Sequence, residues 1–304
     1  MASGESAALR GRLDWGRLGS LSLRVAAVTE GLLVGAHRSV RRGAGVEFGG
    51  HRQYVPGDDL RWLDRRALMR HERLLVREFE TDTETSVRLV LDASASMRWA
   101  SEGAPGRKLD YAALVLAAVG RVALATGDPV ALEVVAGRDA APVPPSVGQG
   151  QFERLVAALE RVVPDGSVTE GALAEALSRI ARGARRGAVV VLASDLLDWP
   201  SGALEAFVGL GAGRRRLVAV QVLDPAEAQF PWSGPQRLRS SEGDLLVETD
   251  GDAVRGRYQA ALLALQRRWS DALLARGGRL VRTGTTEDPL VPVREVLRAV
   301  EARG

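Results

Sequence analysis

Three oxygen-bearing side chains stand at alternate positions in one short run, and together they have the chemistry of a metal site. The run DASAS places Asp92, Ser94 and Ser96 directly after the apolar, β-branched segment SVRLVL. Alternate positions of a tight loop can turn two hydroxyls toward one point beside a carboxylate. Mg²⁺ prefers such oxygen ligands in near-octahedral order and keeps several of its waters. The run therefore predicts a divalent-metal site.

Two further loops carry oxygen atoms suited to the same ion. A second apolar segment, AVVVLAS, is followed by Asp195, and the turn DGSVTE holds hydroxyls at Ser167 and Thr169. Two carboxylates just neutralise a divalent ion, and hydroxyls add no charge. An ion that one carboxylate reaches only through water stays electrophilic and favours an anionic oxygen from outside. We therefore expect the site to bind an acidic group of a partner, such as an Asp or a Glu.

Each of these side chains also has a purely structural interpretation. The serines of DASAS can cap their loop, and its aspartate can shape a strand-end turn. Ser167 and Glu170 have the spacing of a capping box at a helix start. Asp195 can cap the helix that follows it. Singly, the structural interpretation is favoured for each residue; together, two strand-end carboxylates and three hydroxyls in suitable loops favour a common site.

The surrounding sequence predicts the elements that would position these loops. Continuous apolar runs predict strands at 86–92, 129–136, 188–195, 216–224 and 279–284. Helical spacing predicts helices at 108–127, 152–163, 169–184, 204–212, 257–277 and 292–302. Apolar strands separated by helices indicate a doubly wound, mostly parallel α/β sheet covered on both faces. Ligands of such sheets bind outside the carboxyl ends of the strands, where the loops after Asp92 and Asp195 lie.

The first 85 residues differ in character and are predicted to form an N-terminal extension to a domain at 86–304. Helical spacing covers 21–33, and short strands are predicted at 46–48 and 74–79, with a turn at PGDD (56–59) between them. In the domain that follows, a further weak strand is predicted at 244–249. We interpret the segment EFGGHRQYVPGDD as a strand and turn laid against the domain. Docking of a partner is the alternative.

Composition excludes several classes of function. The chain of 304 residues is 46% hydrophobic and 26% charged, with a net charge of +3, as in ordinary globular proteins. Cysteine is absent, which excludes disulfides, thiolate metal sites and a cysteine nucleophile. Basic residues are not interleaved with aromatics, so we expect no nucleic-acid partner. No apolar stretch is long enough for a membrane span and no secretory signal is evident, so we expect a cytoplasmic protein. Of the 41 Lys and Arg residues only one, Lys108, is a lysine.

Two family resemblances go beyond these patterns. DASAS resembles the DxSxS of the metal-ion-dependent adhesion site (MIDAS) in von Willebrand factor A domains. The stretches VEFGGHRQYVPGDDLRWLD, LLVREFE and VLDPAEAQFPW resemble the bacterial DUF58 family, and the resemblance runs from about Thr29 to about Thr286. It implies a von Willebrand factor A-like fold and a site for Mg²⁺ or Mn²⁺ rather than Ca²⁺.

The family register assigns the ligands. Gly166-Ser167 followed by Ala172-Leu173 places Ser167 where the family usually has Thr, which keeps the hydroxyl. A second departure, Arg65 where the family usually has Trp, concerns the N-terminal segment and not the metal site. The implied metal ligands are Asp92, Ser94, Ser96, Ser167 and Asp195, with Thr169 as the alternative to Ser167.

The resemblance also implies a partner. Family members are often paired with MoxR-type AAA+ ATPases, which implies such an ATPase here and a chaperone-like or assembly role. Our main hypothesis is a metal-dependent protein-binding adaptor that is not an enzyme. The alternatives are a metal-dependent hydrolase, which uses the ion as a Lewis acid, and an interaction scaffold without metal.

A hydrolase requires a general base near the ion. The three histidines, His37, His51 and His71, lie outside the predicted metal loops, which leaves Asp198 as the nearby candidate. The sequence also lacks a P-loop, a G-x-S-x-G elbow and an H-E-x-x-H motif. These observations favour the adaptor over the hydrolase.

Overall fold

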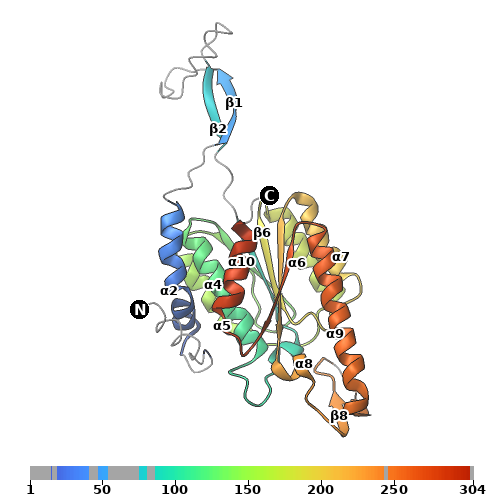
Figure 1. Ribbon diagram of the computed structural model, residues 1–304. Coiled ribbons are helices and arrows are strands. Elements are labelled where there is room, and N and C mark those ends of the chain that lie inside the picture. The colour runs from blue at the N-terminus through green and yellow to red at the C-terminus, as the bar shows by residue number, and fades with distance from the viewer. Residues whose placement is uncertain are drawn as a thin grey trace, which may run out of the picture.

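The computed structural model describes Trp15 and residues 19–40, 47–53, 75–80, 86–242 and 246–301. Its centre is a six-stranded sheet with the strand order β10-β7-β6-β3-β4-β5 (Figure 1). The strands are β3 (Val87–Asp92), β4 (Val130–Val135), β5 (Val143–Ser146), β6 (Val189–Ser194), β7 (Arg216–Leu223) and β10 (Arg279–Gly284). Neighbouring strands run parallel, except that β5 pairs antiparallel with β4 at the sheet edge.

The two central strands, β3 and β6, mark the place where a ligand can bind. Counted along the chain within this sheet alone, the strand order is 3-2-1-4-5-6. In doubly wound sheets, ligands bind outside the carboxyl ends of the strands at the point where this order reverses. That point lies between β3 and β6, which pair in parallel from Val87↔Val189 to Leu91↔Ala193. Their carboxyl ends lie at the lower edge of the sheet in Figure 1, on the side where α8 (Pro225–Gln229) is seen.

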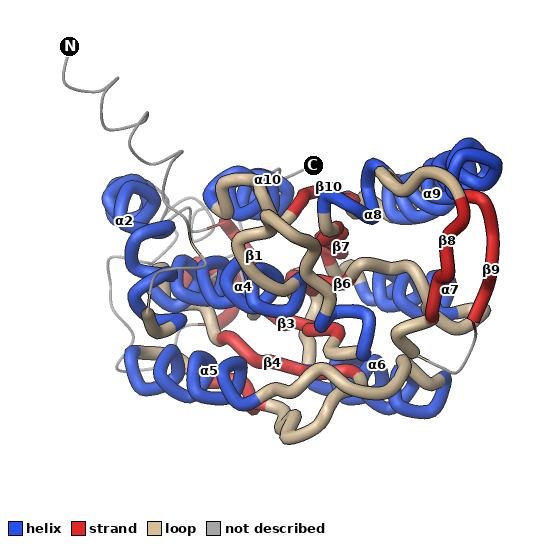
Figure 2. Tube along the Cα trace, turned by 90° about the horizontal axis from the view of Figure 1, so that it is seen from below, coloured by secondary structure: helices blue, strands red, loops and turns tan. Residues whose placement is uncertain are grey.

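Helices cover both faces of the sheet, as the view in Figure 2 shows. One face packs against α2 (Leu21–Val40), α4 (Lys108–Ala125), α5 (Gln149–Arg161) and α10 (Leu290–Glu301). The other packs against α6 (Glu170–Gly183), α7 (Ala203–Gly209) and α9 (Gly251–Leu274). Strand side chains alternate, so Leu89 and Leu91 of β3 enter the first core and Val90 enters the second. The predicted doubly wound, mostly parallel sheet is confirmed, and it is the architecture that the resemblance to von Willebrand factor A domains implied.

Helix α4 lies at the centre of the first core and is therefore apolar around most of its surface. Its residues are buried almost throughout, from Lys108 to Ala123. A Cβ added at Gly120 would come within 2.8 Å of the Leu155 side chain and 3.2 Å of the Leu89 side chain. Glycine at this position therefore allows α4 to pack closely against α5 and β3.

The structure adds elements that the sequence patterns did not predict. The Pro-rich segment after β4, for which no strand was predicted, contains the edge strand β5. There Pro144 and Pro145 are exposed, and a sheet edge tolerates their missing N–H groups. The polar excursion after β7 contains an antiparallel pair, β8 (Pro235–Arg239) and β9 (Leu246–Asp250), whereas only a weak strand at 244–249 was predicted. Two short 3₁₀ helices, η2 (Ala95–Arg98) and η3 (Leu210–Gly213), were also missed.

Capping side chains explain two helix starts that differ from the predictions. The short helix α8 was not predicted; Asp224 and Glu227 form a capping box at its start. Helix α9 begins at Gly251 and not at Arg257, because the Asp250 carboxylate accepts hydrogen bonds from the backbone N–H groups of the helix's first turn.

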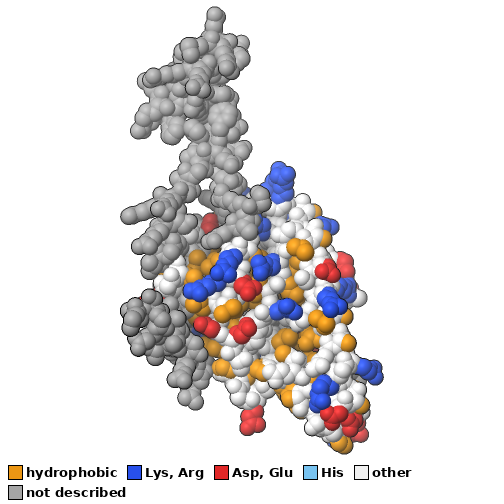
Figure 3. Space-filling view, viewed as in Figure 1, with side chains coloured by type: hydrophobic (Ala, Val, Ile, Leu, Met, Phe, Trp, Pro, Cys, Tyr) orange, Lys and Arg blue, Asp and Glu red, His pale blue; other side chains and the backbone are white. Residues whose placement is uncertain are grey.

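The described part of the N-terminal region contains α2 and an antiparallel pair, β1 (Glu47–Gln53) and β2 (Leu75–Glu80), so both predicted strands are present. The predicted PGDD turn and Arg65 lie outside the described residues. Trp15 packs edge-on against Tyr111 of α4, with ring centroids 5.3 Å apart, and its indole N–H donates to the Thr285 carbonyl at 2.9 Å. None of the helices in the described ranges is long and apolar enough to cross a membrane. On the face shown in Figure 3, basic and acidic side chains intermingle.

Candidate metal centre

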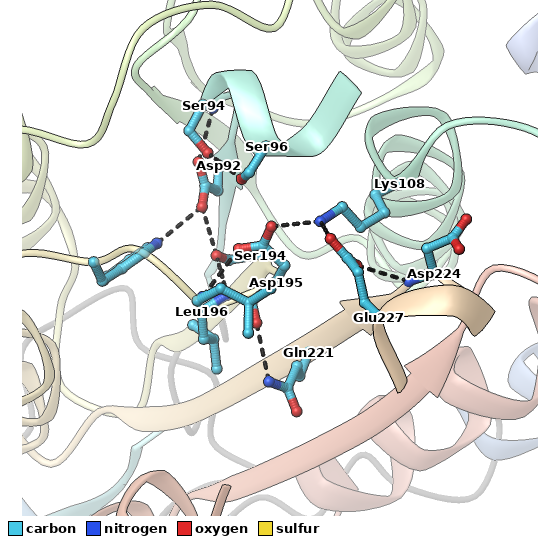
Figure 4. Close-up of polar contacts among 12 residues, drawn as sticks. Asp92, Ser94, Ser96, Lys108, Ser194, Asp195, Leu196, Gln221, Asp224 and Glu227 are labelled. Atoms are coloured by element: carbon cyan, nitrogen blue, oxygen red, sulfur yellow. Dashed lines mark hydrogen bonds and ion pairs between the residues drawn. The ribbon is translucent and has the colours of Figure 1, made fainter. Parts of the chain in front are cut away.

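The serine-containing loop after β3 brings its polar atoms together as predicted. The Oγ atoms of Ser94 and Ser96 lie 3.1 Å apart, and both side chains are buried. Asp92 Oδ1 accepts the Ser94 backbone N–H at 2.9 Å, which folds the loop back over the strand end (Figure 4). Ser94 stands at the N-cap of η2 but makes no capping hydrogen bond with its side chain. Loop capping therefore does not account for the Ser94 hydroxyl.

The Asp92 carboxylate is fully buried and held by donors from two other segments. Its Oδ2 accepts the Ser194 hydroxyl at 2.5 Å and the Trp199 indole N–H at 2.9 Å. Burial and the nearby Asp195 carboxylate raise the pKa of Asp92, while these hydrogen bonds oppose the rise. Within the described part of the chain, Asp92 Oδ1 accepts a hydrogen bond from the Ser94 N–H alone and thus keeps lone-pair capacity toward the serine hydroxyls.

Asp195, directly after β6, has a partner that the sequence analysis did not predict. Lys108 Nζ donates to Asp195 Oδ2 at 2.6 Å and also to the Glu227 carboxylate. Glu227 is oriented in turn by the Asp224 backbone N–H, which donates to its Oε2 at 3.0 Å. Burial opposes the charge on Lys108, yet the two carboxylates outweigh it and raise the pKa of this lysine. Asp195 is therefore ion-paired and does not cap α7, whose N-cap residue is Gly202.

The turn that holds Ser167 lies beside the DASAS loop. The Ala95 N–H donates to the Gly166 carbonyl at 2.8 Å, and the Asp165 N–H donates to the Ala93 carbonyl at 3.0 Å. The capping-box interpretation of Ser167 is wrong, because the N-cap of α6 is Thr169.

Thr169 and Ser167 thus differ in what else they do. Thr169 Oγ1 accepts the Ala172 N–H at 3.2 Å, so this hydroxyl serves the helix. Ser167 is exposed and has no capping role, which favours it over Thr169 as the second-loop ligand.

Several polar residues of the site were missed by the sequence analysis. Ser194 and Trp199 bind Asp92, and Gln221 Nε2 donates to the Asp195 backbone carbonyl at 2.9 Å. Glu242, in the connection between β8 and β9, places its carboxylate near the Ser96 and Ser94 hydroxyls. None of these four has a recognisable spacing relative to DASAS. Lys108, by contrast, carried a signal in being the only lysine of the chain.

The donor set fits a hard divalent cation at the DASAS loop. One carboxylate and two converging hydroxyls are oxygen ligands of the kind that Mg²⁺ and Mn²⁺ accept. Within the described ranges, no group of three His, Cys, Asp or Glu side chains is arranged to hold a metal, so such a site depends on the serines. Two carboxylates, Asp195 and Glu227, contact the single ammonium of Lys108, and the buried carboxylate of Asp92 lies near Asp195. In ionised form the three carboxylates leave two negative charges for a divalent ion to balance.

Comparison with known proteins places the chain in a family. The model of the family described as "Protein of unknown function DUF58" matches residues 50–268, and the chain belongs to this family. It is 28% identical over 300 residues to uncharacterized proteins of Mycobacterium bovis and Mycobacterium tuberculosis, covering 97% of this chain and 92% of each relative.

Similar solved structures include two that span most of the α/β domain. The conserved hypothetical protein BatB from Bacteroides thetaiotaomicron is 19% identical, covers 72% of this chain and 100% of its own, and has a TM-score of 0.49. A von Willebrand factor type A protein from Catenulispora acidiphila is 16% identical, covers 74% of this chain and 43% of its own, and has a TM-score of 0.38.

Proposed function

We propose that this protein is a non-catalytic adaptor that binds an acidic group of a partner protein through a divalent ion. The observation that carries the proposal is the pair of buried hydroxyls, Ser94 and Ser96, 3.1 Å apart beside the buried Asp92 carboxylate. The ion is Mg²⁺ or Mn²⁺, held by the predicted ligand set Asp92, Ser94, Ser96, Ser167 and Asp195. A site of this kind leaves a coordination position for a carboxylate from outside.

The contact made by Glu242 supports the choice of an acidic ligand. Its carboxylate lies near the hydroxyls of Ser94 and Ser96 although it comes from a separate part of the chain. A protein carboxylate therefore has the size and chemistry to sit at the open side of these serines. Hydroxyls donate to carboxylates, and a metal ion at the same place would strengthen the attraction.

The surroundings of the nearby acidic and basic groups weigh against the hydrolase. Asp198, the base considered from the sequence, is exposed. Lys108 and Glu227 are already committed to each other and to Asp195. A general base must reach a water or substrate beside the ion, and Glu227 is instead ion-paired with Lys108. We therefore propose a binding protein and not an enzyme.

The partner we propose is a MoxR-type AAA+ ATPase, in a chaperone-like or assembly role, as family membership implies. The test is a pull-down from the native host with the full chain as bait, in Mg²⁺ and in chelator. We expect an ATPase of this class to be retained only with Mg²⁺ and to be lost with Ser94→Ala/Ser96→Ala. If the ATPase is retained equally in Mg²⁺ and in chelator, the metal-bridged interface is refuted.

Metal binding itself is tested separately by calorimetry with Mg²⁺ and Mn²⁺. Wild type should release or absorb binding heat, and Asp92→Ala should abolish it. Asp139→Asn is the matched control, because Asp139 is an exposed aspartate outside the site. If wild type shows no binding of either ion, the metal-free scaffold replaces the present proposal.

A further inference from the structure

The one lysine of this chain stands at the candidate metal centre. All other basic side chains among the 41 Lys and Arg residues are arginines, yet Lys108 is the residue buried between Asp195 and Glu227. An ammonium is a compact charge with three rotatable donors, whereas a guanidinium is large, planar and forked. At this point the space and the two converging carboxylates suit the ammonium. The residue type is thus matched to a specific electrostatic position.

The surroundings of Lys108 fix that position. Its side chain is 0% exposed, and its Nζ atom lies 2.6 Å from Asp195 Oδ2. Glu227 accepts from the other side and is held by the capping box of α8. Asp195 is held as well, because its Oδ1 accepts the Leu197 N–H at 3.1 Å. In Figure 4 Asp195 lies between Lys108 and the two serines, so the lysine approaches the site from the side opposite to the hydroxyls.

We propose that Lys108 is the resident counter-cation of the metal centre and that it lowers the affinity of the centre for a divalent ion. By neutralising Asp195, it leaves Asp92 as the anionic ligand that faces the serine hydroxyls. The ion is then held loosely and keeps more of its positive charge for the carboxylate of a partner. This inference rests on the proposed function and adds the residue that tunes it.

Removal of the Lys108 charge and removal of the Glu227 charge should change the affinity for Mn²⁺ in opposite directions. Lys108→Met removes a positive charge and frees Asp195, so the site should bind Mn²⁺ about tenfold more tightly or better. Glu227→Gln removes a negative charge and leaves Lys108 to Asp195 alone, so the affinity for Mn²⁺ should fall by about tenfold. A residue with a merely structural role would weaken binding in both variants.

The experiment titrates Mn²⁺ into the full chain and follows the loss of the free-ion signal by electron paramagnetic resonance. Arg107→Met is the matched control, because it removes a positive charge from the adjacent, solvent-exposed residue that pairs with Asp110. Its affinity should equal that of wild type within about twofold, because water and salt screen exposed charges. Thermal unfolding of each variant establishes that it is folded. If Lys108→Met does not fold, the affinity of Glu227→Gln for Mn²⁺ tests the inference.

The outcomes separate this inference from the proposed function. If wild type binds Mn²⁺ and Lys108→Met binds it equally or less tightly while folded, the inference fails and the proposed function stands. If Lys108→Met does not fold, unchanged or tighter binding by Glu227→Gln likewise overturns the inference. If wild type does not bind but Lys108→Met does, the lysine blocks the site, so the inference stands and the metal-dependent function fails. If no variant binds, both fail.

Discussion

The hydroxyl of Ser194 donates to Asp92 Oδ2 at 2.5 Å, and this bond joins the carboxyl ends of the two central strands, β6 and β3. Both side chains are fully buried. The parallel pairing of β3 with β6 ends one residue earlier, at Leu91↔Ala193, so the bond continues the link between the two strands where the candidate site begins. The Ser194 hydroxyl is also one of the donors that favour the ionised form of the buried Asp92 carboxylate.

Ser194→Ala should therefore destabilise the protein by about 1.5–3 kcal/mol, the usual range for a hydrogen bond to a charged group. The measurement is urea unfolding followed by circular dichroism. Ser201→Ala, at an exposed serine, should change the unfolding free energy by less than about 0.5 kcal/mol. Equal effects of the two substitutions would mean that the Ser194 bond contributes nothing to the strand-end structure.

The ion pair of Lys108 and Asp195 should show strong coupling in a double-mutant cycle. Both side chains are at most 1% exposed, so Lys108→Met leaves Asp195 as a buried charge without its cation, at a cost of about 3–5 kcal/mol. In Asp195→Asn, Lys108 keeps its contact with Glu227, so the loss should be smaller. Lys108→Met and Asp195→Asn should each destabilise the protein, and the double variant should recover part of the loss. Unfolding free energies of the four proteins give the coupling directly. Additive losses would show that the two groups do not interact.

Trp199 should report metal binding through its fluorescence. Its indole N–H donates to Asp92 Oδ2, and its ring packs edge-on against Trp269 with centroids 5.6 Å apart. An ion that binds the Asp92 carboxylate alters the charge beside this indole. We expect Mg²⁺ to change the tryptophan emission of wild type and to leave that of Trp199→Phe almost unchanged. A persistent change in Trp199→Phe, with calorimetry showing unimpaired binding, would place the ion away from Asp92.

Alkaline pH should destabilise the protein through Tyr258. Burial, followed by the nearby Glu227 carboxylate, raises the pKa of Tyr258 to about 12 from its ordinary value of 10.0. A raised pKa in the folded state means that the neutral phenol favours folding; this contribution is complete below pH 10 and is lost as the pH rises toward 12. Between pH 10 and about pH 12, the unfolding free energy of Tyr258→Phe, measured in urea, should fall by less than that of wild type. Parallel pH profiles of the two proteins would contradict the assignment.

The sequence patterns predicted the fold well because the central strands are buried on both faces. SVRLVLD and AVVVLASD are largely apolar for that reason, and each ends in a carboxylate at the same sheet edge. β5 and β8 escaped prediction, and β9 was predicted only as a weak strand, because these strands lie at edges or outside the main sheet, where burial no longer dictates an apolar pattern.

The candidate site could be predicted only where it is local in sequence. DASAS needs a single loop, so its convergence follows from spacing alone. Lys108, Glu227 and Ser194 reach the site from three different segments, and only the folded packing brings their side chains together. The capping-box spacing of Ser167 and Glu170 was misleading, since Thr169 lies two positions closer to the helix and takes the cap.

Glu242 should compete with the acidic group of a partner. Its carboxylate lies near the hydroxyls of Ser94 and Ser96, and burial together with nearby Asp198 raises its pKa. Glu242→Gln removes the charge of this internal group but keeps nearly the same volume, so in Mg²⁺ it should retain several-fold more of the partner in the pull-down. Glu248→Gln is the control, because Glu248 is an exposed carboxylate of the adjacent strand β9. Equal retention by wild type and both variants would show that the partner does not use the position that Glu242 occupies.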